Sequence, residues 1–194
     1  MNIIISPAKK MNINNDDLVN EYKPVFMDKT NILYDKLKSL SYDELKKLLA
    51  CNDDIAELNY DRYKYMNLDK NLSPAILTYE GIQYKYMSPD SFSEEEFNYI
   101  KSHLKILSGF YGVLNPFDGV VPYRLEMQAK LKVEDSKNLY EFWGDSLYKE
   151  LRKESNVILN LASKEYSKCI EKYLSEETYI EKKSSKEALG NTPG

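Results

Sequence analysis

The pattern of apolar and polar residues along the chain predicts strands and helices in alternation. Four short apolar runs are typical of buried strands: Asn2–Ser6, Ala75–Glu80, Leu104–Leu107 and Asn156–Leu161. Three other segments carry apolar residues three or four positions apart and are predicted helices: Asp28–Leu40, Asp54–Met66 and Asn138–Arg152. This alternation favours an α/β fold, with a mixed, mostly parallel sheet flanked by helices.

Serine residues mark the start of further helices. Ser41 and Ser93 are each followed by a glutamate three residues later, a capping box in which each side chain bonds the other residue's backbone N–H. The Ser41 helix, followed by the Asp54–Met66 helix, predicts a helical hairpin insertion at about residues 41–66. Ser163 can cap one more helix after the last predicted strand.

The composition suits one domain. Of the 194 residues, 42% are hydrophobic and 30% are charged, as in ordinary globular proteins. We predict a single domain over residues 1–180. The stretch 181–194 is polar and has no periodicity, so we expect a disordered tail there.

The charge is distributed unevenly. A net charge of −4 argues against attraction of the whole surface to nucleic acid or anionic lipid. Residues 1–100 carry 12 cations and 17 anions, a balance of −5, whereas residues 101–132 carry five cations and two anions, a balance of +3. The basic stretch also contains a glycine turn, which directs the search for a site to this part of the chain.

Targeting and cofactor signals are absent from the sequence. No apolar run approaches the roughly 18 residues that cross a bilayer, so we expect no membrane partner. The first residues lack the basic lead of a signal peptide, which predicts a cytoplasmic protein. Cys51 and Cys169 match no disulfide or zinc spacing, and His103 is the one histidine. We therefore expect no metal and no other cofactor.

The first candidate site follows the Leu104–Leu107 strand. This strand enters a glycine-bracketed turn, Ser108-Gly109-Phe110-Tyr111-Gly112. Such a turn can expose backbone N–H groups at the carboxyl edge of a sheet, where open α/β sheets bind ligands. The alternative is a tight turn that needs a positive φ and has no ligand.

The second candidate site is the segment Pro122–Met127. If this segment is extended, Arg124 and Glu126 share one face, and Tyr123 and Leu125 share the other. Arginine can hold a carboxylate or a phosphate through two N–H groups. The alternative is a structural ion pair between Arg124 and a partner carboxylate.

Two further segments follow predicted strands. In Asn160–Tyr166 a strand passes directly into a helix, whose free N–H groups can bind an anion, or Ser163 simply caps this helix. Glu165 in the first helical turn is favourable for the helix dipole, and Tyr166 follows it. Lys9, just after the first strand, is expected at the same sheet edge, although exposed lysines are usually solvated surface.

Six segments together resemble the YaaA family of bacterial peroxide-stress proteins. They are Ile4-Ile5-Ser6-Pro7-Ala8-Lys9, Tyr79-Glu80-Gly81-Ile82-Gln83-Tyr84, His103-Leu104-Lys105-Ile106-Leu107-Ser108-Gly109-Phe110-Tyr111-Gly112, Pro122-Tyr123-Arg124-Leu125-Glu126-Met127, Leu139-Tyr140-Glu141-Phe142-Trp143-Gly144 and Asn160-Leu161-Ala162-Ser163-Lys164-Glu165-Tyr166. Each segment is a weak signal, but six in the same order are specific, and they span roughly Met1 to Ile180.

The resemblance implies a cytoplasmic protein of the hydrogen-peroxide response that limits oxidative damage linked to unincorporated iron. It also implies an α/β fold that binds DNA through a positively charged cleft, in part by a helix-hairpin-helix element, which would be Ser41–Met66 here. The hairpin loop Cys51-Asn52-Asp53-Asp54 departs from a phosphate-binding loop, because it has no glycine and two acids. Arg62 and Lys64 could still contribute.

Other departures from the family pattern concern single positions and the end of the chain. Gln128 stands where glycine is usual, and Asn115 stands where arginine is common. Family members continue through a basic segment and closing strands that residues 181–194 do not resemble, which implies a truncated product or a foreign tail.

Three functions remain open from the sequence. The first is a DNA-binding stress protein without ordinary turnover. The second is an enzyme or binder for a nucleotide or nucleobase, in which Arg124 holds phosphate, a tyrosine stacks on the base, and Glu126 or Glu165 acts as general base; Ser108, Tyr111 and Ser163 would complete that pocket. The third is a protein in which these motifs only build the core and the turns. The sequence contains no convincing catalytic triad.

Overall fold

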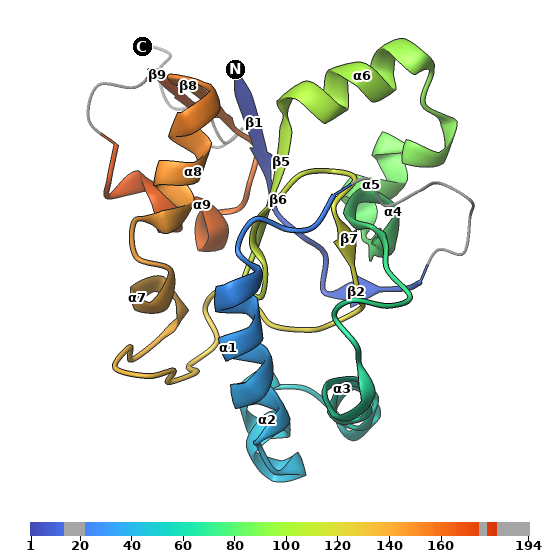
Figure 1. Ribbon diagram of the computed structural model, residues 1–194, viewed down its shortest axis with the longest axis vertical. Helices are drawn as coiled ribbons and strands as arrows, with labels where there is room; N and C mark the ends of the chain where they lie inside the picture. The colour runs from blue at the N-terminus through green and yellow to red at the C-terminus, as the bar shows by residue number, and fades with distance from the viewer. Residues whose placement is uncertain (14–21, 175–177, 182–194) are drawn as a thin grey trace, which may run out of the picture.

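A computed structural model describes residues 1–13, 22–174 and 178–181 (Figure 1). Its main sheet has five strands in the order β6-β5-β1-β8-β9. The strands are β1 (Asn2–Ile5), β5 (Leu104–Ser108), β6 (Gly112–Leu114), β8 (Val157–Asn160) and β9 (Thr178–Glu181). Strands β5, β1, β8 and β9 run parallel, and β6 pairs antiparallel with β5. The predicted mixed, mostly parallel sheet is therefore confirmed.

The strand register places three chain-distant segments at one edge of the sheet. In β1, Ile3 is paired with Leu104 of β5 on one side and with Leu159 of β8 on the other. Because these strands are parallel, the residues that follow Ile5, Ser108 and Asn160 leave the sheet at the same end. This edge is where the candidate site lies.

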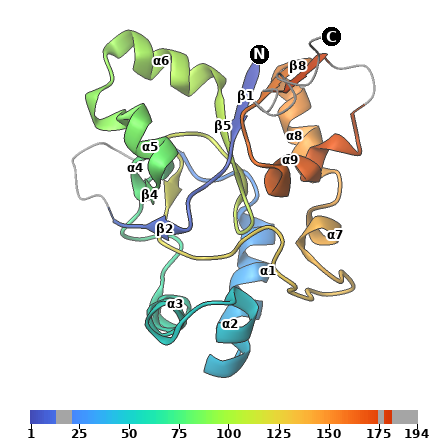
Figure 2. The same cartoon turned by 180° about the vertical axis from the view of Figure 1, so that it is seen from behind.

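Helices surround the sheet. They are α1 (Met27–Lys38), α2 (Tyr42–Leu49), α3 (Asp53–Tyr65), α4 (Ala75–Thr78), α5 (Ile82–Met87), the 3₁₀ helix η1 (Pro89–Ser91), α6 (Glu94–His103), α7 (Leu139–Trp143), α8 (Ser146–Glu154) and α9 (Lys164–Glu171). Side-chain caps mark the start of four of them, α2, α3, α6 and α7. The capping boxes at Ser41 and Ser93 are both present. Figures 1 and 2 place α1, α2 and α3 together at the end of the molecule away from the N-terminus. The predicted helical pair α2–α3 is in contact.

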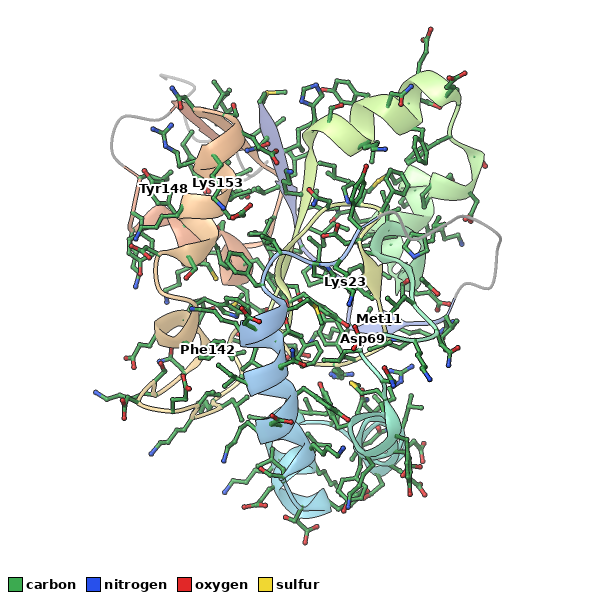
Figure 3. The ribbon with its side chains drawn as sticks, viewed as in Figure 1. Met11, Lys23, Asp69, Phe142, Tyr148 and Lys153 are labelled. Atoms are coloured by element: carbon green, nitrogen blue, oxygen red, sulfur yellow. The ribbon has the colours of Figure 1, made fainter. Side chains whose placement is uncertain are left out.

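Two small sheets fasten the loops that lie beside the main sheet. Strand β2 (Lys10–Met11) pairs antiparallel with β4 (Tyr79–Glu80), and β3 (Ser73–Pro74) pairs antiparallel with β7 (Gly119–Val120). The buried side chain of Met11, labelled in Figure 3, reaches the Pro122–Met127 segment, where its Sδ accepts the N–H of Tyr123 at 3.5 Å. The β2–β4 pair thus holds one wall of the candidate site.

Two predicted elements differ from the structure. The predicted strand Ala75–Glu80 is wrong over its first four residues, which form α4, and only Tyr79 and Glu80 pair as a strand. Thr78 Oγ1 donates to the carbonyl of Pro74 at 2.8 Å, a bond that closes this short helix. The predicted helix Asn138–Arg152 is two helices, α7 and α8, because Gly144 adopts a positive φ of 52° between them.

Two further predictions concern the end of the chain and membrane-spanning helices. Glu181 ends β9, so the predicted tail does not begin before residue 182, and residues 182–194 lie outside the described residues. Within the described part of the chain, no helix has the length and apolar character that a membrane span requires.

Candidate functional site

A pocket of about 170 Å³ lies at the carboxyl edge of the sheet, beyond β1 and β8. Three chain-distant segments line it: residues 6–9, 123–126, and Ser163 with Glu165 and Tyr166. We call it the Arg124 pocket. Seven of the residues singled out in the sequence are among its lining: Lys9, Tyr123, Arg124, Glu126, Ser163, Glu165 and Tyr166. The four others, which belong to the glycine turn, do not line it.

One carboxylate joins two cations on the wall of the Arg124 pocket. The Glu126 Oε1 atom accepts from Lys9 Nζ at 2.9 Å and from Arg124 Nη2 at 3.1 Å. The side chains of Arg124 and Glu126 are only 14% and 17% exposed, whereas that of Lys9 is 63% exposed. Arg124 and Glu126 therefore share a face, as the alternation predicted, and they also form an ion pair with each other.

The start of α9 forms the opposite wall. Ser163 is the N-cap residue, but its side chain makes no capping bond. Instead the Ser163 N–H donates to Ser6 Oγ at 2.8 Å, and the Ser6 hydroxyl donates to Ser163 Oγ at 3.1 Å. As a result, the N–H groups of Lys164 and Glu165 have no acceptor among the described residues. Free N–H groups at a helix start are donors for a ligand acceptor.

Glu165 connects the walls of the pocket. Its Oε1 accepts the N–H of Gln128 at 3.2 Å, and its backbone carbonyl accepts the hydroxyl of Tyr140 at 2.9 Å. Within the described residues, the Gln128 N–H is the one hydrogen-bond partner of the Glu165 carboxylate, and its second oxygen has no partner there. Gln128 thus contributes through its backbone N–H, which any residue except proline could supply.

Two tyrosines close the inner end of the pocket. The hydroxyl of Tyr123 lies 2.6 Å from Ser108 Oγ and 2.7 Å from the hydroxyl of Tyr79. Burial raises the pKa of Tyr123 to about 12, and burial also raises the pKa of Tyr166 far above its usual range. Both phenols are therefore neutral near pH 7, and because the Tyr123 hydroxyl is already bonded to Ser108 and Tyr79, the two residues offer aromatic surface and not a base.

The glycine turn supports the pocket from beneath. Ser108 is fully buried, and its Oγ accepts the N–H groups of Phe110 at 3.1 Å and of Tyr111 at 2.8 Å. The turn's N–H groups therefore point inward onto Ser108, and the expected exposed donors for a ligand are not found there. A Cβ on Gly109 would lie 2.5 Å from the carbonyl oxygen of Leu125, so only glycine lets the pocket wall pack this closely.

Tyr111 and Gly112 complete this buried support. The buried hydroxyl of Tyr111 accepts the N–H of Val121 at 3.2 Å, which holds the loop that precedes the pocket wall. Gly112 has a φ of +79°, and a Cβ there would collide with Trp143 and Phe26. The expectation of a tight turn with a positive φ is confirmed at Gly112.

The alternation of buried and exposed residues that begins at Tyr123 continues to Val133. From Tyr123 to Val133 the odd-numbered residues are buried, and the even-numbered residues are partly or fully exposed. The outward row is Arg124, Glu126, Gln128, Lys130 and Lys132. A strict apolar period of two was visible in the sequence at Leu125, Met127, Ala129, Leu131 and Val133, and it could have revealed this row.

The outward row leads from the Arg124 pocket into a groove of about 620 Å³. Glu126 lines both, so the two are contiguous. The groove lies between this row and the helices α1 and α2, and we call it the lysine groove. Its lining is Lys36, Leu40, Glu44, Lys47, Leu48, Ala50, Glu126, Gln128, Ala129, Lys130, Leu131 and Lys132.

The charges of the lysine groove are mostly positive and open. Lys36, Lys47, Lys130 and Lys132 are exposed, and none of them is in a salt bridge within the part of the chain that the structure describes. The two carboxylates are already engaged: Glu44 accepts the backbone N–H and hydroxyl of Ser41, which lowers its pKa, and Glu126 binds its two cations. The groove thus has unpaired cations on both walls.

The basic stretch 101–132 does not form one surface. Arg124, Lys130 and Lys132 face the pocket and the groove, whereas Lys101 and Lys105 line a different cavity near the start of β5. There the Lys105 Nζ donates to Asn115 Oδ1 at 2.7 Å and lies 2.7 Å from Glu154. The sequence count of +3 is therefore divided between the two ends of the sheet.

The lining of the Arg124 pocket has a definite set of chemical groups. Among the described lining residues there is no histidine and no cysteine, and His103 lies elsewhere, with its Nδ1 2.9 Å from the carbonyl oxygen of Met1. Within the described residues, no group of three His, Cys, Asp or Glu side chains could hold a metal ion. The lining offers hydrogen-bond donors, hydrogen-bond acceptors and aromatic surface.

The fold and this edge pocket define an α/β protein with a ligand-sized site at the carboxyl ends of its parallel strands. The chain belongs to the family described as peroxide stress protein YaaA, whose model matches residues 1–190. It is similar to a UPF0246 protein of Desulfitobacterium hafniense, with 62% identity over 174 residues that cover 90% of this chain and 69% of the relative. A UPF0246 protein of Lachnoclostridium phytofermentans is 57% identical over 180 residues, which cover 93% of this chain and 71% of the relative.

Proposed function

We propose that this member of the peroxide stress family acts in the cytoplasm and binds DNA through the lysine groove, and that DNA binding helps to limit iron-linked oxidative damage. Family membership supports the role in peroxide stress. The observation that carries DNA binding is the set of four exposed lysines, Lys36, Lys47, Lys130 and Lys132, on the two walls of one groove. An unpaired lysine can neutralise a phosphate of DNA. Each such contact releases counterions that were condensed on the DNA, and this release favours binding.

The spacing of the lysines also suits a phosphate backbone. Lys130 and Lys132 are both exposed and flank the buried Leu131, and two residues of extended backbone span roughly 7 Å. Lys36 of α1 and Lys47 of α2 face them from the other wall. A strand of DNA in the groove would thus meet cations on both sides.

In this proposal the flank of α2 contacts DNA, whereas the loop that connects α2 to α3 does not. At the loop, Asp53 accepts from Lys46 Nζ at 2.6 Å and from the Tyr42 hydroxyl at 2.8 Å. The loop therefore presents an acid and an already paired lysine. Lys47, one position farther along α2, faces the groove and forms no salt bridge among the described residues.

A salt titration of DNA affinity tests the groove. The double variant Lys130→Ala/Lys132→Ala should bind a labelled duplex about tenfold more weakly at low salt and reduce the slope of log affinity against log salt by about 2, because two phosphate contacts are lost. The matched control is Lys149→Ala/Lys153→Ala on α8, which removes the same charge outside the groove. Figure 3 labels Lys153 on α8, away from α1 and α2. Fluorescence anisotropy measures the affinity of both variants.

The outcomes separate the groove from nonspecific charge. If the α8 control weakens binding as much as the groove variant does, net charge alone governs affinity, and the groove is not the site. If the unchanged protein has no affinity for DNA at low salt, the proposed function is wrong for this chain.

Protection from iron-linked damage has its own assay. Supercoiled plasmid exposed to ferrous iron and hydrogen peroxide is nicked, and bound protein should slow this nicking. The groove variant should protect less than the α8 control at equal concentration. Equal protection by the two variants would separate protection from DNA binding and remove that part of the proposal.

A further inference from the structure

The Arg124 pocket has unused hydrogen-bonding capacity of both signs. Glu126 uses only its Oε1 atom and Glu165 only its Oε1 atom, so one oxygen of each carboxylate has no partner among the described residues. On the same wall, the backbone N–H of Glu165 has no acceptor there either. A ligand that both donates and accepts would satisfy these groups.

The charges of the pocket disfavour an anion. Its lining contains two cations, Lys9 and Arg124, and two carboxylates, Glu126 and Glu165, a formal balance of zero. A phosphate placed here would lie beside both carboxylates, and like charges at such range repel. An uncharged ligand with polar edges meets no such penalty.

The size and the walls point to a small planar ligand. The volume of about 170 Å³ lies below the roughly 300–1,000 Å³ that is typical of pockets for drug-sized ligands. It suits a single ring system and is small for a whole nucleotide. The apolar part of the lining consists of Pro7, Ala8, Leu125 and the two tyrosines Tyr123 and Tyr166. Flat apolar faces and aromatic side chains pack well together.

We propose that the Arg124 pocket binds one nucleobase that carries an exocyclic amino group. The amino group donates to the free carboxylate oxygen of Glu165 or Glu126, as carboxylates accept from cytosine N4 in other proteins. A ring nitrogen or carbonyl oxygen of the base accepts an N–H at the start of α9. Neither uracil nor thymine has this amino group.

The base has two possible sources. One is a free nucleobase in solution. The other is an unpaired base of DNA, which can reach the pocket because Glu126 lines both the pocket and the lysine groove. Only the second source rests on the proposed function, since it needs DNA in the groove. Extrusion of a base is least costly where the base is already unpaired.

The first arm of the test uses free bases with the full chain. Cytosine and adenine should raise the thermal unfolding midpoint, while thymine and inorganic phosphate should not. Glu165→Gln keeps the side-chain size and an acceptor for the Gln128 N–H, but replaces the free oxygen by a donor. It should weaken binding of cytosine about tenfold, which corresponds to ~1.4 kcal/mol. The control Glu150→Gln on α8 removes the same charge outside the pocket and should bind like the unchanged protein.

The second arm uses DNA. A duplex with one unpaired cytosine should bind more tightly than the fully paired duplex, and Glu165→Gln should abolish this difference while leaving affinity for the paired duplex unchanged. Unfolding of the ligand-free variants by urea shows that each is folded. A preference in this arm without binding of free cytosine assigns the base to DNA, and binding in the first arm alone assigns it to a free base.

The inference is overturned if neither arm shows a preference for the amino-bearing base, if Glu150→Gln changes binding as much as Glu165→Gln does, or if phosphate alone shifts the midpoint. These failures are distinct from failure of the proposed function. Loss of the DNA affinity of the lysine groove would leave the free-base arm standing, and tight binding of paired DNA without any base effect would leave the groove standing.

Discussion

Two charged regions at opposite ends of the sheet differ in how their groups are satisfied. Near the start of β5, Lys105, Asn115, Asp118 and Glu154 form a closed network, which we call the Lys105 cluster. Lys105 has two acceptors, Asn115 and Glu154, and its side chain is only 7% exposed. Asp118 is fully buried and accepts the backbone N–H of Asn115 at 2.9 Å. At the other end, the Arg124 pocket keeps free donors and acceptors.

The comparison separates charges that fold the protein from charges that can bind. A buried charge costs several kcal/mol unless partners replace its water, so the groups of the Lys105 cluster turn toward one another. In the Arg124 pocket and the lysine groove, exposed lysines and free carboxylate oxygens remain, and water satisfies them until a ligand does. The number of charged residues alone would not distinguish the Lys105 cluster from the Arg124 pocket.

The largest expected effect tests the Lys105 cluster. Lys105→Met keeps most of the apolar stem but removes the charge, which leaves Asn115 Oδ1 without its donor and Asp118 without a nearby cation. We expect a loss of about 3 kcal/mol in the free energy of unfolding. Urea denaturation measures it, and DNA affinity of the folded variant should not change.

The matched variant in the lysine groove is Lys130→Met. Its side chain is exposed and has no salt bridge within the described residues, so its stability should stay within about 0.5 kcal/mol of the unchanged protein. If Lys105→Met and Lys130→Met lowered the free energy of unfolding by similar amounts, the charges at the two ends of the sheet would not differ in their contribution to folding.

A smaller effect concerns the pH dependence of the Lys105 cluster. Burial raises the pKa of Asp118 from 3.8 to about 6, although the bonds from Asn115 oppose this rise. The folded state therefore holds this proton to higher pH than the unfolded state does. The resulting stabilisation is full below the unfolded-state pKa of about 4 and is lost as pH rises through 6, and we expect its full value to be about 3 kcal/mol.

Comparison with Asp118→Asn isolates this contribution. Several other carboxylates, such as Glu44 and Glu96, have lowered pKa values because their capping serines bond to them, and their effect on stability has the opposite sign. The difference in unfolding free energy between the unchanged protein and Asp118→Asn should fall by about 2 kcal/mol between pH 4 and pH 7. A difference that is flat or grows with pH would contradict the raised pKa.

Local signals explain which parts of this fold could be predicted from the sequence. The capping boxes at Ser41 and Ser93 depend on residues three apart, and the strands β1, β5 and β8 are apolar runs with clear ends. The failures at α4 and at Gly144 have tertiary and backbone causes: Ala75 donates its N–H to Asp118, far along the chain, and a single glycine with positive φ divides one helical stripe.

Sheet topology alone predicts which segments meet at the candidate site, but not how they pack there. Parallel strands end at one edge, which is why residues after Ile5 and Asn160 meet in one pocket. The glycine turn packs behind the pocket wall and does not line the pocket. This position depends on the close approach of Gly109 to the carbonyl of Leu125, and no sequence pattern encodes that contact. The second wall of the lysine groove likewise comes from packing of α1 and α2 against a distant segment.

The smallest expected effect concerns Lys9, the one exposed member of the ion pairs in the Arg124 pocket. Lys9→Ala removes the 2.9 Å contact with Glu126, but the Lys9 side chain is 63% exposed and Arg124 still holds the same oxygen. Exposed ion pairs contribute little, so the unfolding free energy should change by less than about 0.5 kcal/mol. The same variant shifts the charge of the pocket from zero to −1, which should disfavour anions further without removing an acceptor for a base. Urea denaturation and cytosine titration measure the two effects. A loss of several kcal/mol would mean that Lys9 belongs with Lys105 among the charges that fold the protein, and the division between the two ends of the sheet would then be lost.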